Sequence, residues 1–315
     1  MSELERAVET VVGPCLGVQA GEDVVIVVDR TTESLGAALR AAAAERGGEA
    51  VLCVMEEREV DGQEPPAAVA AALAAATVFI APTHRSLSHT RARKAASDAG
   101  ARGATLPGVT DDILARLMAC DFELMARRSR AVAELLDAAA GARVTCPLGS
   151  DLRLDLSGRA AIADDGDLGA AGAFGNLPCG EGFVSPLGGE GTLYASSLGP
   201  IGLPGEPVRL TVADGRLTAA DGDFGARWAA ILDAAGEQGR NLAELGVGTN
   251  ERARLTGNIL EDEKMLGTVH VAFGASAGIG GTVAVPVHLD CLVKDATLDV
   301  GGTRVLAGGE FVLEP

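Results

Sequence analysis

Residues 23–29 read DVVIVVD, an uninterrupted apolar run with an aspartate at each end. Such a run is typical of a strand that is buried on both faces, which occurs mostly in parallel sheets covered by helices. Thr31 and Thr32 follow it and can cap a helix that continues through Ala44 to a Gly-Gly pair. This stretch therefore predicts the first strand and the first crossover helix of an α/β domain.

The alternation of strands and helices continues downstream. Further buried strands are predicted at residues 49–55, 77–81 and 101–106, with helices between them, and a long helical stretch over residues 111–140 closes the domain. Strands separated by helices imply a parallel sheet with right-handed crossovers. No glycine-rich phosphate-binding sequence follows a strand, so the α/β domain, residues 1–142, has no evident nucleotide signature.

The character of the sequence changes at residue 143, after which glycine is frequent and short strand patterns dominate. These strand patterns lie at residues 152–156, 208–212, 269–273, 283–289 and 298–300. A helical pattern is found at residues 224–238, and the short stretch at 241–245 fits either a helical or an extended segment. Residues 143–315 are therefore predicted to form an α+β domain rich in antiparallel strands.

Composition excludes some partners. The chain of 315 residues has 26 basic and 44 acidic side chains, a net charge of -18, whereas nucleic-acid binding relies on basic side chains. Its six cysteines are scattered without a C-x-x-C pair, which is typical of reduced thiols in a cytosolic protein. The amino terminus is acidic, and no apolar stretch is long enough for a membrane span. We expect a cytoplasmic protein without a nucleic-acid or membrane partner.

Two histidines near the end of the chain lie in strand patterns beside acidic residues. In a strand, His288 and Asp290 point to one face while Val287 and Leu289 point to the other. His270 alternates in the same way with apolar neighbours. Each histidine could simply be a hydrogen-bonded strand residue, but two imidazoles and a carboxylate on neighbouring strands are suitable ligands for a divalent metal. We therefore expect a metal site in the second domain.

Two glutamates are further candidates for this site. Glu181 lies in the Gly/Pro-rich segment GNLPCGEGF, at residues 175–183, and loops of this kind often carry functional groups. Glu244 lies in NLAELGVGTN, at residues 241–250. The alternative interpretation makes Glu181 a turn carboxylate and Glu244 a surface charge.

Four segments closely resemble the metallo-aminopeptidases of the thermophilic aminopeptidase T type, in particular the shorter members labelled leucyl aminopeptidase-like. These segments are NLPCGEGFVSP from residue 176, NLAELGVGTN from residue 241, GNILEDEKMLGTVHVAFG from residue 257 and VPVHLD from residue 285. They occur in the same order, and the resemblance covers nearly the whole chain.

This resemblance implies that five residues hold two metals, usually zinc or cobalt, with manganese as a further candidate. The implied ligands are Glu181, Glu244, His270, His288 and Asp290. The metals would activate a water molecule against a peptide carbonyl, giving a hydrolase for a small amine- or peptide-bearing substrate. The resemblance also implies a homodimer.

The sequence departs from these peptidases at one position. They carry a tyrosine a few residues after the first histidine, whereas the residues after His270 read VAFGASA, and the single tyrosine is Tyr194. Without this oxyanion donor, we expect weak or absent activity on unselected dipeptides.

The same chain also resembles the iron(II) dioxygenases that open 2,5-dihydroxypyridine. That resemblance implies that His270, His288 and Asp290 surround one iron and that Glu181 lies near the substrate. It further implies that His89, in the turn SLSHT, contacts the substrate ring, acting within one subunit or across the dimer. The alternative for His89 is a residue of a helix-capping turn. Another metal-dependent reaction, or metal binding without catalysis, is also compatible with these motifs.

Overall fold

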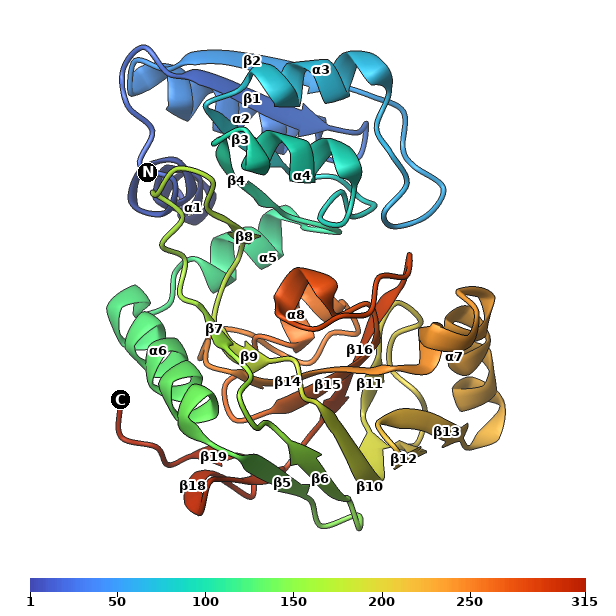
Figure 1. The fold of residues 1–315 in the computed structure, drawn as a ribbon. Coiled ribbons are helices and arrows are strands. Elements are labelled where there is room, and N and C mark those ends of the chain that lie inside the picture. The colour runs from blue at the N-terminus through green and yellow to red at the C-terminus, as the bar shows by residue number, and fades with distance from the viewer. The chain divides into compact units, whose positions relative to one another are not determined.

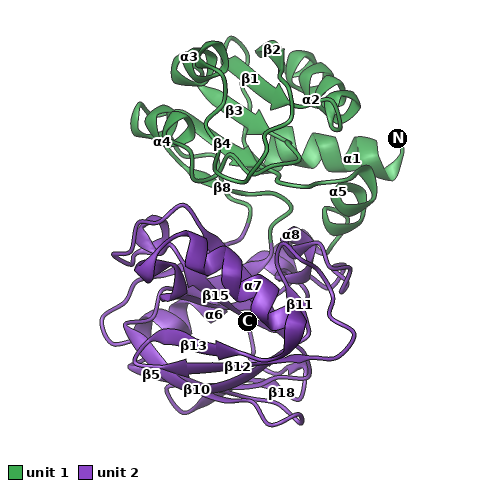
Figure 2. Cartoon of the chain, turned by 90° about the vertical axis from the view of Figure 1, so that its right-hand side faces the viewer, with its two compact units in different colours: residues 1–120, 166–179 green, residues 121–165, 180–315 purple.

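The computed structural model describes all 315 residues and contains two compact units (Figures 1 and 2). Unit 1 comprises residues Met1–Cys120 and Gly166–Cys179, and unit 2 comprises Asp121–Asp165 and Gly180–Pro315. This division differs from the boundary that we expected between residues 142 and 143. The chain leaves unit 1 after Cys120 and returns to it for one short segment.

Unit 1 is built on a five-stranded parallel sheet with the order β2-β1-β3-β4-β8. Its strands are β1 (Asp23–Val28), β2 (Glu49–Val54), β3 (Val78–Ala81), β4 (Arg102–Thr105) and β8 (Phe174–Asn176). The first four confirm the predicted α/β pattern. The fifth, β8, was not predicted, because three residues are too few to show a periodicity.

Helices cover both faces of this sheet, which explains why β1 is apolar from Val24 to Val28. They are α1 (Glu3–Thr10), the π-helix η1 (Val11–Cys15), α2 (Glu33–Glu45), α3 (Ala67–Ala75), α4 (Arg91–Asp98) and α5 (Asp111–Leu117). Helices α3 and α4 pack side by side on one face, and α1 and α2 lie on the other (Figure 2).

The predicted single helix over residues 111–140 is wrong. The chain instead forms α5, a short turn, and α6 (Phe122–Ala138). The break lies at Asp121, whose side chain accepts a hydrogen bond from the amide of Leu124 and so caps α6. An aspartate that caps one helix in this way also ends the continuity of the preceding helical pattern.

Unit 2 contains two antiparallel sheets, as the glycine-rich second half predicted. The eight-stranded sheet has the order β13-β12-β10-β6-β5-β17-β18-β19, and the six-stranded sheet has the order β11-β16-β15-β14-β9-β7. The strands of the larger sheet are β5 (Gly141–Thr145), β6 (Asp151–Asp155), β10 (Gly188–Ala195), β12 (Val208–Ala213), β13 (Arg216–Ala220), β17 (Thr297–Val300), β18 (Thr303–Ala307) and β19 (Glu310–Phe311). Those of the smaller sheet are β7 (Ala161–Asp164), β9 (Glu181–Val184), β11 (Ser197–Leu198), β14 (Leu242–Gly248), β15 (Val269–Gly274) and β16 (His288–Val293).

A single apolar core joins the two sheets of unit 2 with helices α6 and α7 (Gly222–Ala234). Leu193 and Leu210 enter it from the larger sheet, and Val247 and Val271 enter it from the smaller one. Trp228 of α7 is fully buried there. The remaining helical segments of the unit are η2 (Glu237–Arg240), α8 (Ile259–Asp262) and η3 (Ala277–Ile279).

Two sequence predictions in unit 2 need correction. Of the two alternatives for residues 241–245, the helical one is wrong, because residues 242–245 belong to β14, whose seven residues are all buried. A short apolar run in a buried strand has the same local pattern as a buried helical turn. The strand predicted at residues 283–289 begins only at His288, and residues 283–287 form part of the loop before it. No helix of the structure has both the length and the apolar character that a membrane crossing requires.

Candidate metal centre

Four neighbouring strands of the smaller sheet carry the five candidate ligands. Glu181 begins β9, Glu244 lies on β14, and His270 lies on β15. The pair His288 and Asp290 lies on β16. Their sequence neighbours on β14, β15 and β16, such as Val271, point into the apolar core, so the polar side chains share the opposite face. The structure thus places all five residues that the sequence indicated as metal ligands on one face of the smaller sheet.

Small residues make room for these side chains. Ala272 lies between Glu244 and Asp290 in the strand ladder, opposite both of them. Gly246 is paired with His270, and a Cβ atom at this glycine would lie only 1.9 Å from the histidine Nε2. The imidazole therefore lies directly over the backbone of β14, in space that any other residue would fill.

The polar atoms converge in two groups that share one carboxylate. The Nε2 atom of His270 lies 3.0 Å from Oε2 of Glu181 and 3.2 Å from Oε1 of Glu244. The Nε2 atom of His288 lies 3.3 Å from Oε2 of Glu244 and 3.7 Å from Oδ2 of Asp290. Glu181, Glu244 and His270 form one possible metal-binding group, and Glu244, His288 and Asp290 form the other. Glu244 thus directs one oxygen toward each group.

The two histidines are held in different ways. His288 Nδ1 lies at a hydrogen-bond distance of 2.7 Å from the carbonyl oxygen of Ala275, which fixes the ring with Nε2 toward the carboxylates. Metal-binding histidines commonly use a carbonyl in this way. His270 has no hydrogen-bond partner for Nδ1, and the ring is held by its complete burial and by the backbone of β14.

The site concentrates negative charge in a buried place. Burial opposes the charged form of both histidines, but the nearby carboxylates outweigh it and raise the pKa of His270 and of His288 well above the usual value. Burial likewise opposes ionisation of Glu244, yet the hydrogen bonds and charges of the two histidines lower its pKa. The carboxylates that retain protons on the imidazoles would equally attract a divalent cation in their place.

A buried lysine completes the surroundings, and the sequence analysis missed it. The Nζ atom of Lys264 lies 2.5 Å from Glu181 Oε1, 2.7 Å from Glu263 Oε1 and 3.4 Å from Asp164 Oδ2. Burial opposes its charge, but these carboxylates raise the pKa of the ammonium group well above its usual value. The same burial raises the pKa of Asp164 to about 7 and that of Glu263 to about 8. The only sequence signal was a charged EDEK run inside one of the four family-like segments.

The donor set fits a divalent metal. The single Nε2 atom of His270 lies 3.0 Å from Glu181 Oε2 and 3.2 Å from Glu244 Oε1, so two buried carboxylates converge on one imidazole nitrogen. Buried carboxylates are costly unless cations or hydrogen-bond donors satisfy them, and one imidazole nitrogen can donate only one proton to the two. Carboxylate oxygens with imidazole nitrogens suit zinc, cobalt, manganese and iron(II), so the donors alone do not select one metal.

The sequence also drew attention to His89, to Tyr194 and to the stretch after His270 where the peptidases have a tyrosine. His89 belongs to unit 1, where it is exposed in the turn before α4, next to the helix cap Thr90. Tyr194 lies on β10 of the larger sheet. Phe273, three residues after His270, is buried in the core edge-on to Trp228, so no tyrosine hydroxyl occupies that stretch.

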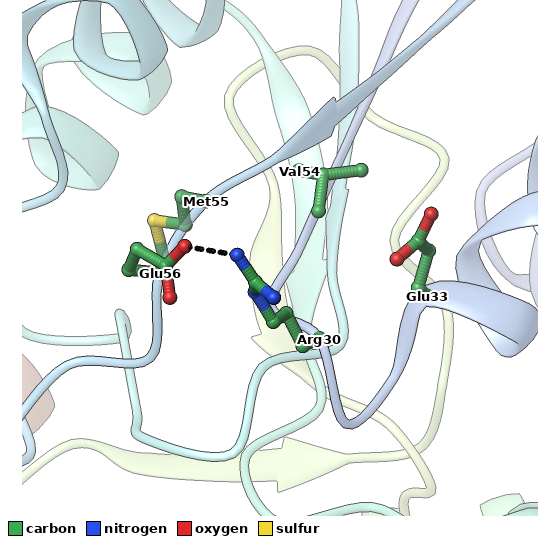
Figure 3. Close-up of a pocket in the computed structure, with 5 residues that line it drawn as sticks. All are labelled: Arg30, Glu33, Val54, Met55 and Glu56. Atoms are coloured by element: carbon green, nitrogen blue, oxygen red, sulfur yellow. Dashed lines mark hydrogen bonds and ion pairs between the residues drawn. The ribbon is translucent and has the colours of Figure 1, made fainter.

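A separate hollow in unit 1 contains none of the candidate site residues. It has a volume of about 430 Å³ and lies beside the end of β2 (Figure 3). Its lining residues are Arg30, Glu33, Val54, Met55 and Glu56. Arg30 and Glu56 pair with each other at 2.7 Å and remain largely exposed, so their charges already satisfy one another.

Comparison with known proteins agrees with this architecture. The family model NicX, described as 2,5-dihydroxypyridine 5,6-dioxygenase, matches residues 3–313. The chain belongs to this family. Membership makes it an enzyme on a scaffold of metal-dependent enzymes. No curated protein sequence matches the chain.

Two solved structures share the fold over essentially the full length. The 2,5-dihydroxypyridine dioxygenase from Pseudomonas putida KT2440 superimposes with a TM-score of 0.85 at 20% identity, covering 100% of this chain and 99% of that one. Wild-type AmpT from Thermus thermophilus superimposes with a TM-score of 0.72 at 18% identity, covering 99% of each chain. Both groups that the sequence resembles are therefore represented among its structural relatives.

Proposed function

We propose that this NicX-family enzyme is a metal-dependent hydrolase of the aminopeptidase type, acting on a small amine- or peptide-bearing substrate. The observation that carries the proposal is the position of Glu244 between two ligand groups. Its oxygens approach His270 and His288 separately, so each half of the site has three protein donors. A single iron held by two histidines and one carboxylate would not require this arrangement.

Bound divalent cations would supply Lewis acidity toward a carbonyl group and would lower the pKa of a bound water molecule. The protein residues hold this site rigid. Hydrogen bonding to Ala275 aims His288, the bare backbone of Gly246 seats His270, and Lys264 holds one oxygen of Glu181.

The absence of a tyrosine after His270 restricts the substrate range in this proposal. Loss of one oxyanion donor typically lowers the rate by about 10²–10³. A dedicated small substrate, bound by several of its own groups, is therefore favoured over general trimming of peptides. We expect weak or absent hydrolysis of unselected dipeptides and amino-acid p-nitroanilides with zinc, cobalt or manganese.

Metal stoichiometry tests the proposal directly. Metal-free protein is loaded with zinc, cobalt or manganese and assayed for bound metal and for hydrolysis of a panel of small amides. Two metals per chain with metal-dependent hydrolysis of a selected amide support the hydrolase. One metal per chain at saturation, with no hydrolysis, contradicts it. The matched variant is Glu244→Gln, which removes the charge shared by both halves and preserves the shape of the side chain. It is expected to bind less metal than the wild type while keeping the fold.

A second candidate is a mononuclear iron(II) dioxygenase that opens a hydroxylated ring. The match of the dioxygenase family model to residues 3–313 favours it. In this proposal His270, His288 and Asp290 hold iron, Glu181 lies near the substrate and His89 contacts the ring. To distinguish the dioxygenase from the hydrolase, the metal-free protein is loaded with iron(II) without oxygen and then exposed to air. Oxygen uptake is measured with 2,5-dihydroxypyridine as the substrate. Iron-specific, substrate-dependent uptake favours the dioxygenase.

A further inference from the structure

The two ligand groups of the candidate centre, called its two halves here, differ in their contact with the ammonium group of Lys264. Lys264 donates a hydrogen bond to Glu181 Oε1, and Glu181 belongs only to the half that contains His270. The ion pairs of Glu244 and Asp290, by contrast, involve only the two histidines. One half therefore has its own carboxylate partly neutralised, and the other does not.

The structure prevents Lys264 from withdrawing. Its side chain has no solvent exposure, and its backbone carbonyl accepts a hydrogen bond from the amide of Asn250. A Cβ atom at Gly248 would lie 2.7 Å from the carbonyl carbon of Lys264, so β14 packs directly against this segment. Asp164 is paired with Glu181 across β7 and β9, and both carboxylates contact the ammonium group. The lysine is thus a fixed part of the site.

We propose that the two metal positions fill in a fixed order. The position formed by Glu244, His288 and Asp290 binds the first ion, and the position formed by Glu181, Glu244 and His270 binds the second. This inference rests on the two-metal centre proposed above. It assigns Lys264 a positioning role, because the lysine contacts a ligand and not the reacting atoms.

The reason is electrostatic. A cation that is hydrogen-bonded to one oxygen of Glu181 reduces the attraction of the other oxygen for a metal and also repels that metal. For unit charges about 4 Å apart at an effective dielectric constant of about 20, the interaction corresponds to roughly 10³-fold in affinity. The carboxylates of Glu263 and Asp164 share the ammonium group and reduce this effect, so we expect a difference of about 10-fold or more. A protein that is supplied with limiting metal should therefore hold its ion at His288 and leave Glu181 with Lys264.

The order is tested by adding cobalt(II), and separately manganese(II), to the metal-free protein in a calorimeter. The wild type is expected to bind two equivalents, the first about 10-fold or more tighter than the second. The variant Glu181→Gln is expected to retain the tight equivalent unchanged and to lose the weak one. The matched variant Asp290→Asn is expected to lose the tight equivalent.

The opposite pattern overturns the proposal: Glu181→Gln loses the tight equivalent and Asp290→Asn retains it. Equal affinity of the two wild-type equivalents also overturns it. If the wild type binds only one equivalent of metal, the proposed two-metal hydrolase is contradicted. The Glu181→Gln titration then still shows which half of the centre holds that single ion. Retention of that one equivalent supports the preference for the His288 half, and its loss contradicts it.

A third variant tests the lysine itself. In Lys264→Met, the second metal equivalent is expected to bind more tightly, so that the ratio of the two metal affinities becomes smaller. An unchanged or larger ratio would contradict the electrostatic explanation. Removing one partner of a buried ionic cluster can prevent folding. Circular dichroism is therefore recorded first, and if Lys264→Met does not fold, the paired Glu181→Gln and Asp290→Asn titrations decide the proposal.

Discussion

The close contact between Gly246 and His270 allows the site to be disturbed by a single methyl group. In Gly246→Ala, the new Cβ atom would lie 1.9 Å from Nε2, 2.3 Å from Cε1 and 2.8 Å from Cδ2 of the imidazole. Ordinary contacts between such atoms are about 3.5–4.0 Å, so the ring must move by roughly 1.5 Å or more. Metal–nitrogen bonds tolerate only about 0.2 Å of deviation. The expected result is the loss of metal from the half of the centre that contains His270.

The fold should survive this change at some cost in stability. Adding a methyl group to a well-packed interior typically destabilises a protein by about 1–3 kcal/mol. Gly205→Ala is the matched control, because a Cβ atom at Gly205 meets no other atom within 4 Å. Both variants would be compared with the wild type by thermal unfolding and by cobalt(II) binding in a calorimeter. Wild-type metal binding by folded Gly246→Ala protein would refute the assigned geometry of His270.

Further predictions concern ligation, assembly and stability. His288→Ala is expected to lose metal while keeping the wild-type circular dichroism spectrum, and retention of full metal content would show that His288 is not a ligand. The protein is expected to be a homodimer, so a monomer mass in light scattering at micromolar concentration would contradict this prediction. A hydrogen bond from Arg102 lowers the pKa of Glu22 despite partial burial. Because the pKa of Glu22 is lower in the folded than in the unfolded state, its ionised form stabilises the fold at pH values above the unfolded-state pKa, and this stabilisation is lost as the pH falls. Glu22→Gln should therefore lower the unfolding temperature at pH 7, and the difference from the wild type should shrink below about pH 4.

The sequence by itself determined the α/β character of the first half and the antiparallel character of the second. Five of the six residues of β1 are buried and apolar, and this pattern is visible in a few consecutive residues. The same local reasoning placed His288 and Asp290 on one strand face, because alternation follows from the geometry of any strand. Motif resemblance then indicated Glu181 and Glu244, which periodicity alone could not select.

Only the tertiary structure decided which charged residues are buried together. Residues 242–245 fit either a helix or a strand locally, but pairing with β9 and β15 makes them part of a strand and places Glu244 between two histidines. Lys264 looks like a surface residue in an acidic run, yet it is fully buried because Asp164 and Glu181, from two other strands, supply its partners. The cost of burying a charge is settled by groups that are distant in sequence, and so local patterns cannot reveal it.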